Sequence, residues 1–339
     1  MLSVRDLTVQ FDTDEGRLQA ATNVSFDLAT GGTLGLVGES GCGKSVSAMS
    51  IPRLIPQPPG HITSGEILLD GVDLLKLPIS EMRHVRGRDI GVIFQEPMTA
   101  LSPLHRIGDQ LAEVVQLHEK RSKKDTRELC LEWLDKVGIP DAEKRMEAFP
   151  FELSGGMRQR VMIAMALIMQ PKLIIADEPT TALDVTIQAQ ILDLLRGVKA
   201  KDSSLLLITH DMGVIWEMCD EMVVMYASRV VESGPVRELF NEPYHPYTEG
   251  LLKSIPGLSS GERRLPHIPG QVPSLLRLPK GCSFADRCPY ATERCRAEQP
   301  SLVTEGRRRV ACFRKEDAAQ GVPSASPLSV TGGMAALHH

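Results

Sequence analysis

Residues 38–45 read Gly38-Glu39-Ser40-Gly41-Cys42-Gly43-Lys44-Ser45, a glycine-rich run that ends in lysine and serine. It has the form G-x-x-x-x-G-K-S, follows an apolar run at residues 33–37 and precedes a helix-compatible stretch at residues 46–51. A strand, a glycine-rich loop and a helix in this order predict a phosphate-binding P-loop. The glycines let backbone N–H groups point inward, and the helix N-terminus adds partial positive charge. A glycine-rich turn with a chance lysine does not account for all these features together.

Composition bounds the class of protein. The chain has 339 residues, 42% hydrophobic and 24% charged, which suits one large α/β domain with an appendage. Its net charge of −5 gives no support for a nucleic-acid or anionic-membrane surface. No apolar run approaches the ~18–20 residues of a membrane span, and residues 1–6 lack the apolar core of a secretion signal. We therefore expect a cytoplasmic protein that reaches a membrane only through partners.

Apolar periodicity outlines an α/β core. Strands are predicted from alternating runs at residues 3–11, 24–28 and 65–71. Continuous apolar runs suit buried strands of a parallel sheet, and they occur at residues 90–94, 173–176 and 205–208. Helices are predicted at residues 107–137, with a polar interruption at 119–126, and at 157–169 and 186–200. The predicted core, residues 1–240, thus carries a helical insertion at about residues 100–160.

Composition changes after Tyr244, where prolines recur and aliphatic runs shorten. We place a domain boundary near residue 240 and predict a C-terminal domain at residues 241–320. Residues 321–339 are rich in small residues and proline, and we expect them to form a disordered tail.

Two acidic residues follow the apolar run at 173–176. Asp177 is placed by its strand to bind Mg²⁺ beside the P-loop, together with the Ser45 hydroxyl. Glu178 is placed one residue further on, where it can polarise an attacking water as a general base. Taken alone, the pair fits a solvated strand end equally well.

The stretch Leu153-Ser154-Gly155-Gly156-Met157-Arg158-Gln159-Arg160 resembles the signature motif of ATP-binding cassette (ABC) ATPases. Ser154 and the glycine amides stand at the start of a predicted helix and offer a second anion site. The resemblance implies that this site serves the γ-phosphate held by a partner subunit. Two ATP molecules then lie between two subunits in a head-to-tail dimer.

Further positions match the order of the family's motifs. Gln95 resembles the Q-loop glutamine, which contacts Mg²⁺ and water. Asp184 resembles the D-loop residue that crosses the dimer interface, and His210 resembles the switch histidine at the γ-phosphate. Phe11 is a candidate for stacking on adenine, although it fits a core position equally well.

The resemblance covers residues 1 to about 235 and implies ATP hydrolysis. It assigns catalytic roles to Lys44, Gln95, Glu178 and His210, and Mg²⁺ ligation to Ser45, Gln95 and Asp177. The residues implied to contact ATP lie in the P-loop, the signature motif and the flanking positions: Phe11, Gly38, Glu39, Ser40, Gly41, Cys42, Gly43, Lys44, Ser45, Val46, Ser154, Gly155, Gly156 and Asp184.

Two segments indicate the class of solute that is transported. Residues 94–103 read FQEPMTALSP, which resembles the FQDPMTSLNP run of ATPases that serve peptide importers. Residues 245–248 read HPYT and resemble the start of the appended domain in the dipeptide, oligopeptide and nickel group. The second segment also fits a proline turn before a helix, but its position just past the predicted core favours the resemblance. Dipeptide, longer-peptide, nickel and glutathione-type cargo all remain open.

Four of the seven cysteines cluster near the C-terminus: Cys282, Cys288, Cys295 and Cys312. In a cytoplasmic protein this clustering favours metal ligation over disulfides. Short C-x-x-C pairs, usual for zinc ribbons, are absent, and resemblance to peptide-importer ATPases implies a 4Fe–4S cluster. Zinc and free thiols are the alternatives. The surrounding arginines fit either compensation of cluster charge or a solvated basic face: Arg287, Arg294, Arg296 and Arg307–Arg309.

The sequence therefore predicts the ATP-hydrolysing subunit of an ABC importer for peptides or a related small solute, peripheral to the cytoplasmic face of the inner membrane. The implied partners are a second ATPase subunit, favoured as a distinct chain, two membrane permeases and an extracytoplasmic solute-binding protein. No nucleic-acid partner is expected. The alternative is a soluble ABC ATPase that acts on ribosomes or DNA, although this chain has neither a second cassette nor a long coiled-coil insertion. The C-terminal region could in addition act as a metal sensor.

Overall fold

The computed structural model describes residues 1–181, 185–198, 202–255 and 267–315. The chain divides into two compact units. Unit 1 comprises Met1, Leu28–Thr33 and Gly71–Ile208, and unit 2 comprises Leu2–Asp27, Leu34–Asp70 and Thr209–His339. The predicted Asp184 and the predicted tail at 321–339 lie outside the described residues.

A parallel sheet forms the centre of unit 1. β7 (Leu173–Asp177) pairs in parallel with β6 (Ile90–Ile93) on one side and with β8 (Ser204–Thr209) on the other. These are the continuous apolar runs of the sequence, and β7 and β8 are buried throughout, as expected for a sheet covered on both faces. Helix α7 (Gly155–Leu167) approaches β6 closely, because a Cβ atom at Gly91 would lie 2.2 Å from the Ala166 carbonyl oxygen.

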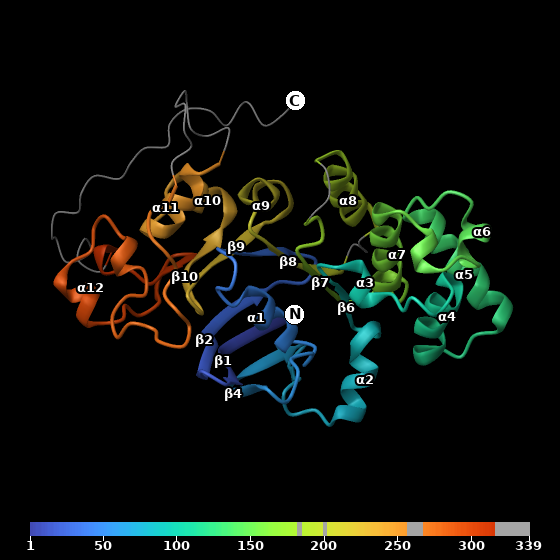
Figure 1. Ribbon diagram of the computed structural model, residues 1–339, viewed down its shortest axis with the longest axis horizontal. Helices are drawn as coiled ribbons and strands as arrows, with labels where there is room; N and C mark the ends of the chain where they lie inside the picture. The colour runs from blue at the N-terminus through green and yellow to red at the C-terminus, as the bar shows by residue number, and fades with distance from the viewer. Residues whose placement is uncertain (182–184, 199–201, 256–266, 316–339) are drawn as a thin grey trace. The chain divides into compact units, whose positions relative to one another are not determined.

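Helices gather beside this sheet within unit 1 (Figure 1). α4 (Ile107–His118), α5 (Lys123–Lys136) and α6 (Ala142–Met146) pack with α7 as the predicted helical insertion. The polar interruption is shorter than the predicted 119–126, since Ser122 caps α5 by accepting the Asp125 amide at 3.1 Å. The other described elements of unit 1 are β5 (Val72–Asp73), α2 (Ile79–Arg88), α3 (Pro97–Ala100), the 3₁₀ turn η1 (Pro150–Glu152) and α8 (Val185–Val198).

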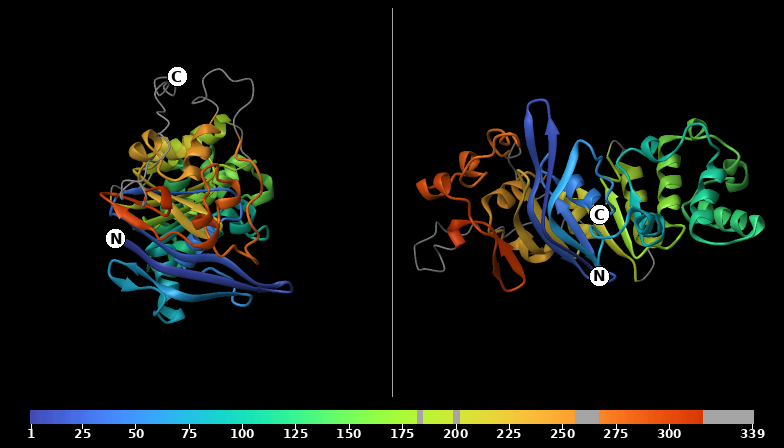
Figure 2. Two further views of the ribbon diagram at one scale, coloured as in Figure 1. Left: turned by 90° about the vertical axis from the view of Figure 1, so that its left-hand side faces the viewer. Right: turned by 90° about the horizontal axis from the view of Figure 1, so that it is seen from below.

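Unit 2 combines an antiparallel sheet with the strand that leads into the P-loop. β1 (Leu2–Thr13) lies between β2 (Gly16–Leu28) and β4 (Gly60–Leu69), and β1 and β2 form the long hairpin visible in Figure 2. β3 (Thr33–Val37) pairs in parallel with β9 (Glu221–Tyr226). β9 continues antiparallel through β10 (Arg229–Pro235) and β12 (Arg308–Val310) to β11 (Val303–Glu305).

The C-terminal region shares a hydrophobic core with the P-loop strand. Val37 at the end of β3 and Tyr226 of β9 belong to the same buried cluster as Tyr247 and Phe284. The helical elements of unit 2 are α1 (Lys44–Ser50), α9 (Met212–Met218), α10 (Val236–Asn241), α11 (Pro246–Lys253), η2 (Ala285–Arg287) and α12 (Glu293–Ala297). Residues before and after position 240 therefore pack together, and the domain boundary placed there stays a prediction.

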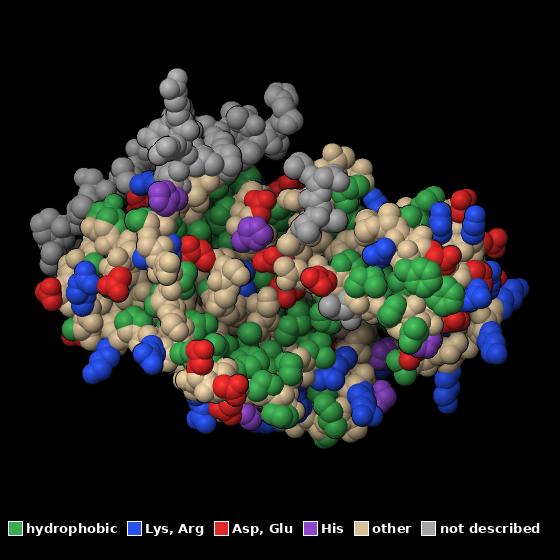
Figure 3. Space-filling view, in the orientation of Figure 1, with side chains coloured by type: hydrophobic (Ala, Val, Ile, Leu, Met, Phe, Trp, Pro, Cys, Tyr) green, Lys and Arg blue, Asp and Glu red, His purple; other side chains and the backbone are tan. Residues whose placement is uncertain are grey.

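The surface shows acidic and basic side chains interspersed on the face drawn in Figure 3. This mixture fits the small net charge of −5. Across the described ranges, none of the helices combines the length and the apolar character needed to cross a bilayer.

Candidate ATP-binding site

The P-loop connects β3 to α1 in unit 2, as the sequence predicts. Gly38 has φ +152° and Gly43, which precedes the first turn of α1, has φ +99°. A Cβ atom at Gly38 would lie 2.2 Å from the Met225 carbonyl oxygen, and one at Gly43 would lie 2.1 Å from that of Ala20. Only glycine fits both the backbone conformation and the space at these two positions.

Lys44 turns back over this loop. Its side chain is buried, and Nζ donates to the carbonyl oxygens of Gly38 at 2.7 Å and Glu39 at 3.1 Å. Ser40, Gly41 and Ser45 are exposed, whereas Cys42 is buried and burial raises the pKa of its thiol. The ammonium group is thus held at the loop while the outer rim of the loop faces solvent, as a phosphate-binding loop requires.

The predicted general base is held by two neighbours in unit 1. The Glu178 carboxylate oxygen Oε2 accepts from Thr181 Oγ1 at 2.7 Å and from Gln95 Nε2 at 3.3 Å. Glu178 has φ +45°, an uncommon conformation for a residue other than glycine. The structure therefore brings two predicted residues together across 83 positions of sequence and adds Thr181, which sequence reasoning missed.

The signature motif begins helix α7 as predicted. The Ser154 hydroxyl caps this helix by accepting the Met157 amide at 3.3 Å. Arg158 Nε donates to the carbonyl oxygens of Pro150 and Leu153, which fixes the chain just before the cap. Ser154 and Gly155 are exposed, so this helix start is open to a second molecule.

The remaining predicted site residues are described within the unit that contains them. Asp177 ends β7 in unit 1 and is 8% exposed. In unit 2, Phe11 lies half-buried in β1 opposite Gly60, and Val46 lies in α1. His210 is exposed immediately after β8, where the following Asp211 caps α9. The roles of these residues toward ATP stay predictions.

The predicted cysteine site lies in unit 2, and all four thiols are free and partly buried. Burial raises the pKa of Cys282 to about 11 and that of Cys312 to about 12, and the neighbouring thiols Cys288 and Cys295 contribute to the first shift. The Cys282 amide donates to the Cys295 carbonyl at 2.7 Å. The four side chains therefore share one neighbourhood. Within the described ranges, however, no three His, Cys, Asp or Glu side chains converge closely enough to hold a metal ion.

The arginines around these cysteines do not form a uniform basic face. Arg287 and Arg308 are buried, and they pair with the carboxylates of Glu39 at 2.6 Å and Glu232 at 2.9 Å. The two interpretations drawn from the sequence, compensation of cluster charge and a solvated basic face, did not include these ion pairs. They could not be inferred from local sequence, because each carboxylate lies far from its arginine along the chain.

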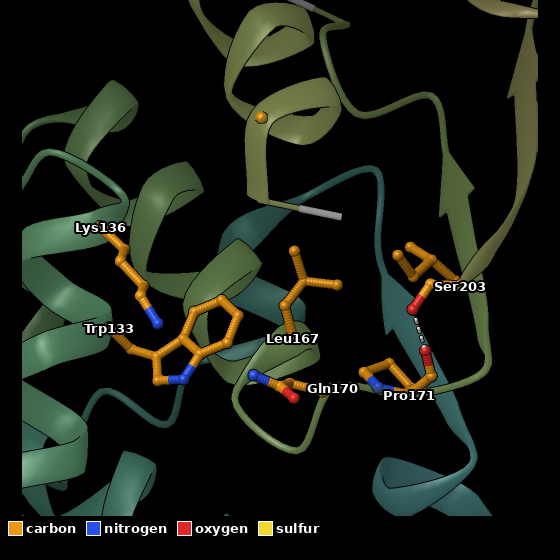
Figure 4. A pocket seen from close by; sticks show the side chains of 8 residues that line it. Trp133, Lys136, Leu167, Gln170, Pro171 and Ser203 are labelled. Carbon is orange, nitrogen blue, oxygen red and sulfur yellow. Dashed lines mark hydrogen bonds between the residues drawn. The ribbon is translucent and has the colours of Figure 1, made fainter. Parts of the chain in front are cut away.

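One pocket of unit 1 lies outside the predicted ATP site. It has a volume of about 250 Å³, and its lining includes Trp133, Lys136, Leu167, Gln170, Pro171 and Ser203 (Figure 4). The Ser203 hydroxyl donates to the Pro171 carbonyl at 2.6 Å. None of the predicted site residues lines this pocket.

Comparisons with known proteins identify the family. The sequence profile of the ABC transporter family matches residues 21–181, and that of the oligopeptide/dipeptide transporter C-terminal region matches residues 231–295. The chain is 53% identical to the oligopeptide transport ATP-binding protein OppD of Bacillus subtilis (strain 168), over 89% of this chain and 85% of that protein. This chain belongs to the ABC transporter ATP-binding proteins.

Other relatives agree with this assignment. The dipeptide transport ATP-binding protein DppD of Bacillus subtilis (strain 168) is 48% identical over 94% of this chain and 96% of its own. The oligopeptide transport ATP-binding protein OppD of Salmonella typhimurium (strain LT2) is 48% identical over 93% of each chain. A solved dimeric ATP-binding cassette in a post-hydrolysis state, bound to ADP and Pi, matches 70% of this chain and 99% of its own, with TM-score 0.62 and 27% identity. The predicted family, fold and ABC-type ATPase are therefore confirmed.

Proposed function

We propose that this chain is the ATP-hydrolysing subunit of an importer for dipeptides or oligopeptides. The observation that carries the proposal is the C-terminal match at residues 231–295, which the chain combines with a complete ordered set of ATPase residues. The names of its relatives at about half identity, oligopeptide and dipeptide transport ATP-binding proteins, support the same cargo.

In this proposal the P-loop binds the triphosphate and Glu178 activates the attacking water. Lys44 contacts the β- and γ-phosphates, and His210 contacts the γ-phosphate. Thr181 and Gln95 orient the Glu178 carboxylate, which accepts a proton from the water as the water oxygen bonds to the γ-phosphorus and the bond from the γ-phosphorus to the ADP leaving group breaks. Phe11 stacks on adenine.

Magnesium suits the donor set that the sequence provides. Ser45, Gln95 and Asp177 offer hydroxyl, amide and carboxylate oxygens, which are the ligands that Mg²⁺ prefers. The Gln95 amide nitrogen contacts Glu178, so the amide oxygen is the atom that would bind the ion. When bound, the ion offsets negative charge on the phosphates.

A second ATPase subunit completes the site in this proposal. Ser154, Gly155, Gly156 and Asp184 contact the ATP held by the partner, which we propose to be a distinct chain. The capped and exposed start of α7 supports this role for the first three residues. The solved dimer of a related cassette is consistent with such pairing.

Two permease subunits are the proposed membrane partners, with an extracytoplasmic solute-binding protein that delivers the peptide. Exposed apolar side chains in unit 1 support a protein contact there: Met98, Leu104 and Phe151 are 41%, 81% and 64% exposed. Figure 3 shows hydrophobic side chains on the surface of the helical part of this unit. The chain would thus lie on the cytoplasmic face of the inner membrane without crossing it.

Co-purification and uptake test this function. The tagged full chain is expected to retain integral membrane subunits, and deletion of its gene is expected to abolish growth on a peptide as sole source of a required amino acid. Recovery of ribosomes or nucleic acid instead of membrane subunits would favour the soluble alternative. Loss of nickel or glutathione uptake in the deletion strain, with peptide uptake unaffected, would contradict the proposed cargo.

We also propose that Cys282, Cys288, Cys295 and Cys312 ligate a 4Fe–4S cluster, with zinc as the alternative. The four thiols are partly buried, and burial together with neighbouring thiols raises the pKa values of Cys282, Cys288 and Cys312, so the closeness of the four cysteines supports a shared set of metal ligands. Because no three of these side chains are placed to hold a metal ion in the described part of the chain, binding would require the cysteine side chains to move. Anaerobically purified protein is expected to absorb near ~400 nm and to contain iron and acid-labile sulfide.

The Cys295→Ser variant is expected to lose this absorbance, whereas Cys130→Ser, which replaces a buried cysteine of unit 1, is expected to retain it. Colourless protein with stoichiometric zinc would support the alternative. Protein without either metal would refute both.

A further inference from the structure

Glu39, the second residue of the P-loop, forms an ion pair with Arg287 of the C-terminal region. Arg287 Nη1 donates to Glu39 Oε2 at 2.6 Å, and Nη2 donates to Oε1 at 3.0 Å. The guanidinium side chain is only 5% exposed and the carboxylate side chain 32%. This is a two-pronged, charge-assisted pair in a largely dry setting, which is the strong form of such an interaction.

The other donors of Arg287 are also used. Nε donates to the Pro269 carbonyl at 2.9 Å, Nη1 to the Tyr226 hydroxyl at 3.3 Å and Nη2 to the Ile268 carbonyl at 3.1 Å. A guanidinium group has five N–H donors in a rigid plane, and each has a partner here. Three hydrogen bonds therefore hold the arginine independently of Glu39. Lysine has a single side-chain nitrogen and cannot reproduce this arrangement.

A second contact holds the backbone of the same residue. The Glu39 amide donates to the Tyr247 hydroxyl at 2.8 Å. Tyr247 packs against Tyr226 and Phe284, with ring centroids 4.6 and 5.5 Å away. Both the side chain and the amide of Glu39 are thus held, by Arg287 and Tyr247, and these two residues both contact Tyr226.

Glu39 in turn touches the atoms that hold Lys44. Its carbonyl oxygen accepts from Lys44 Nζ at 3.1 Å and from the Cys42 amide at 3.3 Å. A rotation of the Glu39 peptide would therefore move both the Lys44 ammonium group and the Cys42 amide. The side chain of Arg287 thereby influences the placement of the groups that bind phosphate.

We propose that Arg287 is a positioning residue of the P-loop, through which the C-terminal region sets the affinity of the loop for a nucleoside triphosphate. The inference rests on the proposed function of residues 38–45 as the triphosphate site. Arg287 belongs to η2 and directly precedes Cys288. The segment that contains the clustered cysteines therefore also contains the arginine that binds Glu39 of the P-loop. The appendage is then part of the nucleotide site and not only an attachment to it.

The test is a double-mutant cycle on the full chain, measured as the Kd of a fluorescent ATP analogue with Mg²⁺. Glu39→Gln and Arg287→Gln are each expected to weaken binding by roughly tenfold, and the double variant by the same factor, because either change removes the same pair. Arg287→Lys is expected to match Arg287→Gln. Arg296→Gln is the matched control, since it breaks the exposed pair with Asp286 in the same region, and its Kd is expected to equal the wild-type value.

Two results would overturn the inference: wild-type affinity in Glu39→Gln, or a double variant weakened by roughly the product of the two single effects. Thermal denaturation of each variant separates lost affinity from lost folding, and Glu39→Gln keeps the test decisive should Arg287→Gln not fold. Lys44→Ala is run alongside. If Lys44→Ala binds the ATP analogue as tightly as wild type, the proposed function fails. If Lys44→Ala abolishes binding while Glu39→Gln, Arg287→Gln and the double variant all keep the wild-type Kd, only the role of Arg287 fails.

Discussion

Acidification is expected to destabilise this chain through one buried histidine, His245. The side chain lies at the N-terminus of α11 and is 2% exposed. Its Nδ1 accepts the Tyr247 amide at 3.1 Å, and its ring lies 5.7 Å from that of Phe284. An imidazole whose nitrogen accepts a hydrogen bond is neutral at that atom, and burial lowers the pKa of His245 to about 3.

The magnitude follows from the difference between folded and unfolded states. In the unfolded chain the histidine takes up a proton below about pH 6.5, whereas the folded chain does not do so until about pH 3. Since the unfolded state binds more protons in this window, stability falls as the pH falls. Each pH unit below about pH 6.5 costs about 1.4 kcal/mol, and about 1.5 units of the interval from about pH 7 to about pH 5 lie below that value, so the loss is about 2 kcal/mol.

Urea unfolding of wild type and His245→Asn at several pH values measures this loss. Asparagine is a good helix cap that can accept the same Tyr247 amide, but it does not titrate. The difference in unfolding free energy between the two proteins is expected to shrink by about 2 kcal/mol between about pH 7 and about pH 5. Other titrating groups, including buried Glu232, are shared by both proteins and cancel. Parallel pH profiles would refute the reasoning.

Three further substitutions test other parts of the structure. Gly43→Ala is expected to abolish nucleotide binding, measured by titration, because its Cβ would lie 2.1 Å from the Ala20 carbonyl oxygen; near-normal affinity would contradict the loop geometry. Arg308→Met leaves the buried Glu232 carboxylate without its charged partner and is expected to cost about 3–5 kcal/mol in chemical denaturation. A loss within about 1 kcal/mol would show that the pair is unimportant. Ser154→Ala is expected to cost about 1 kcal/mol, seen as faster hydrogen exchange in the first turn of α7, and unchanged exchange would argue against the cap.

Local patterns were sufficient to predict the P-loop and the core strands. The P-loop is contiguous, and its glycines have positive φ for the steric reason that the motif encodes. Strands β6, β7 and β8 were visible as apolar runs because a sheet covered on both faces needs apolar side chains on both. The contact between Gln95 and Glu178 agrees with their assignment to one site, which rested on resemblance and not on periodicity.

The carboxylate partners of the arginines could not be predicted in this way. Arg287 and Glu39 are 248 positions apart, and nothing in either neighbourhood specifies the other. In β12, Arg308 is buried whereas Arg309 is partly exposed, because successive side chains of a strand point to opposite faces. A run of three arginines hides this alternation unless the strand itself is recognised.

Hydrolysis by the Glu178→Gln variant shows whether Glu178 is the general base of an ATP-hydrolysing site. With ATP, Mg²⁺ and the partner subunit present, the variant is expected to bind ATP as tightly as wild type. Its turnover is expected to fall below about one hundredth of the wild-type rate, since the general base is lost while the binding groups remain. The pair of subunits is expected to stay associated on ATP and to separate in wild type as ATP is consumed. Turnover near the wild-type rate in Glu178→Gln would contradict the account.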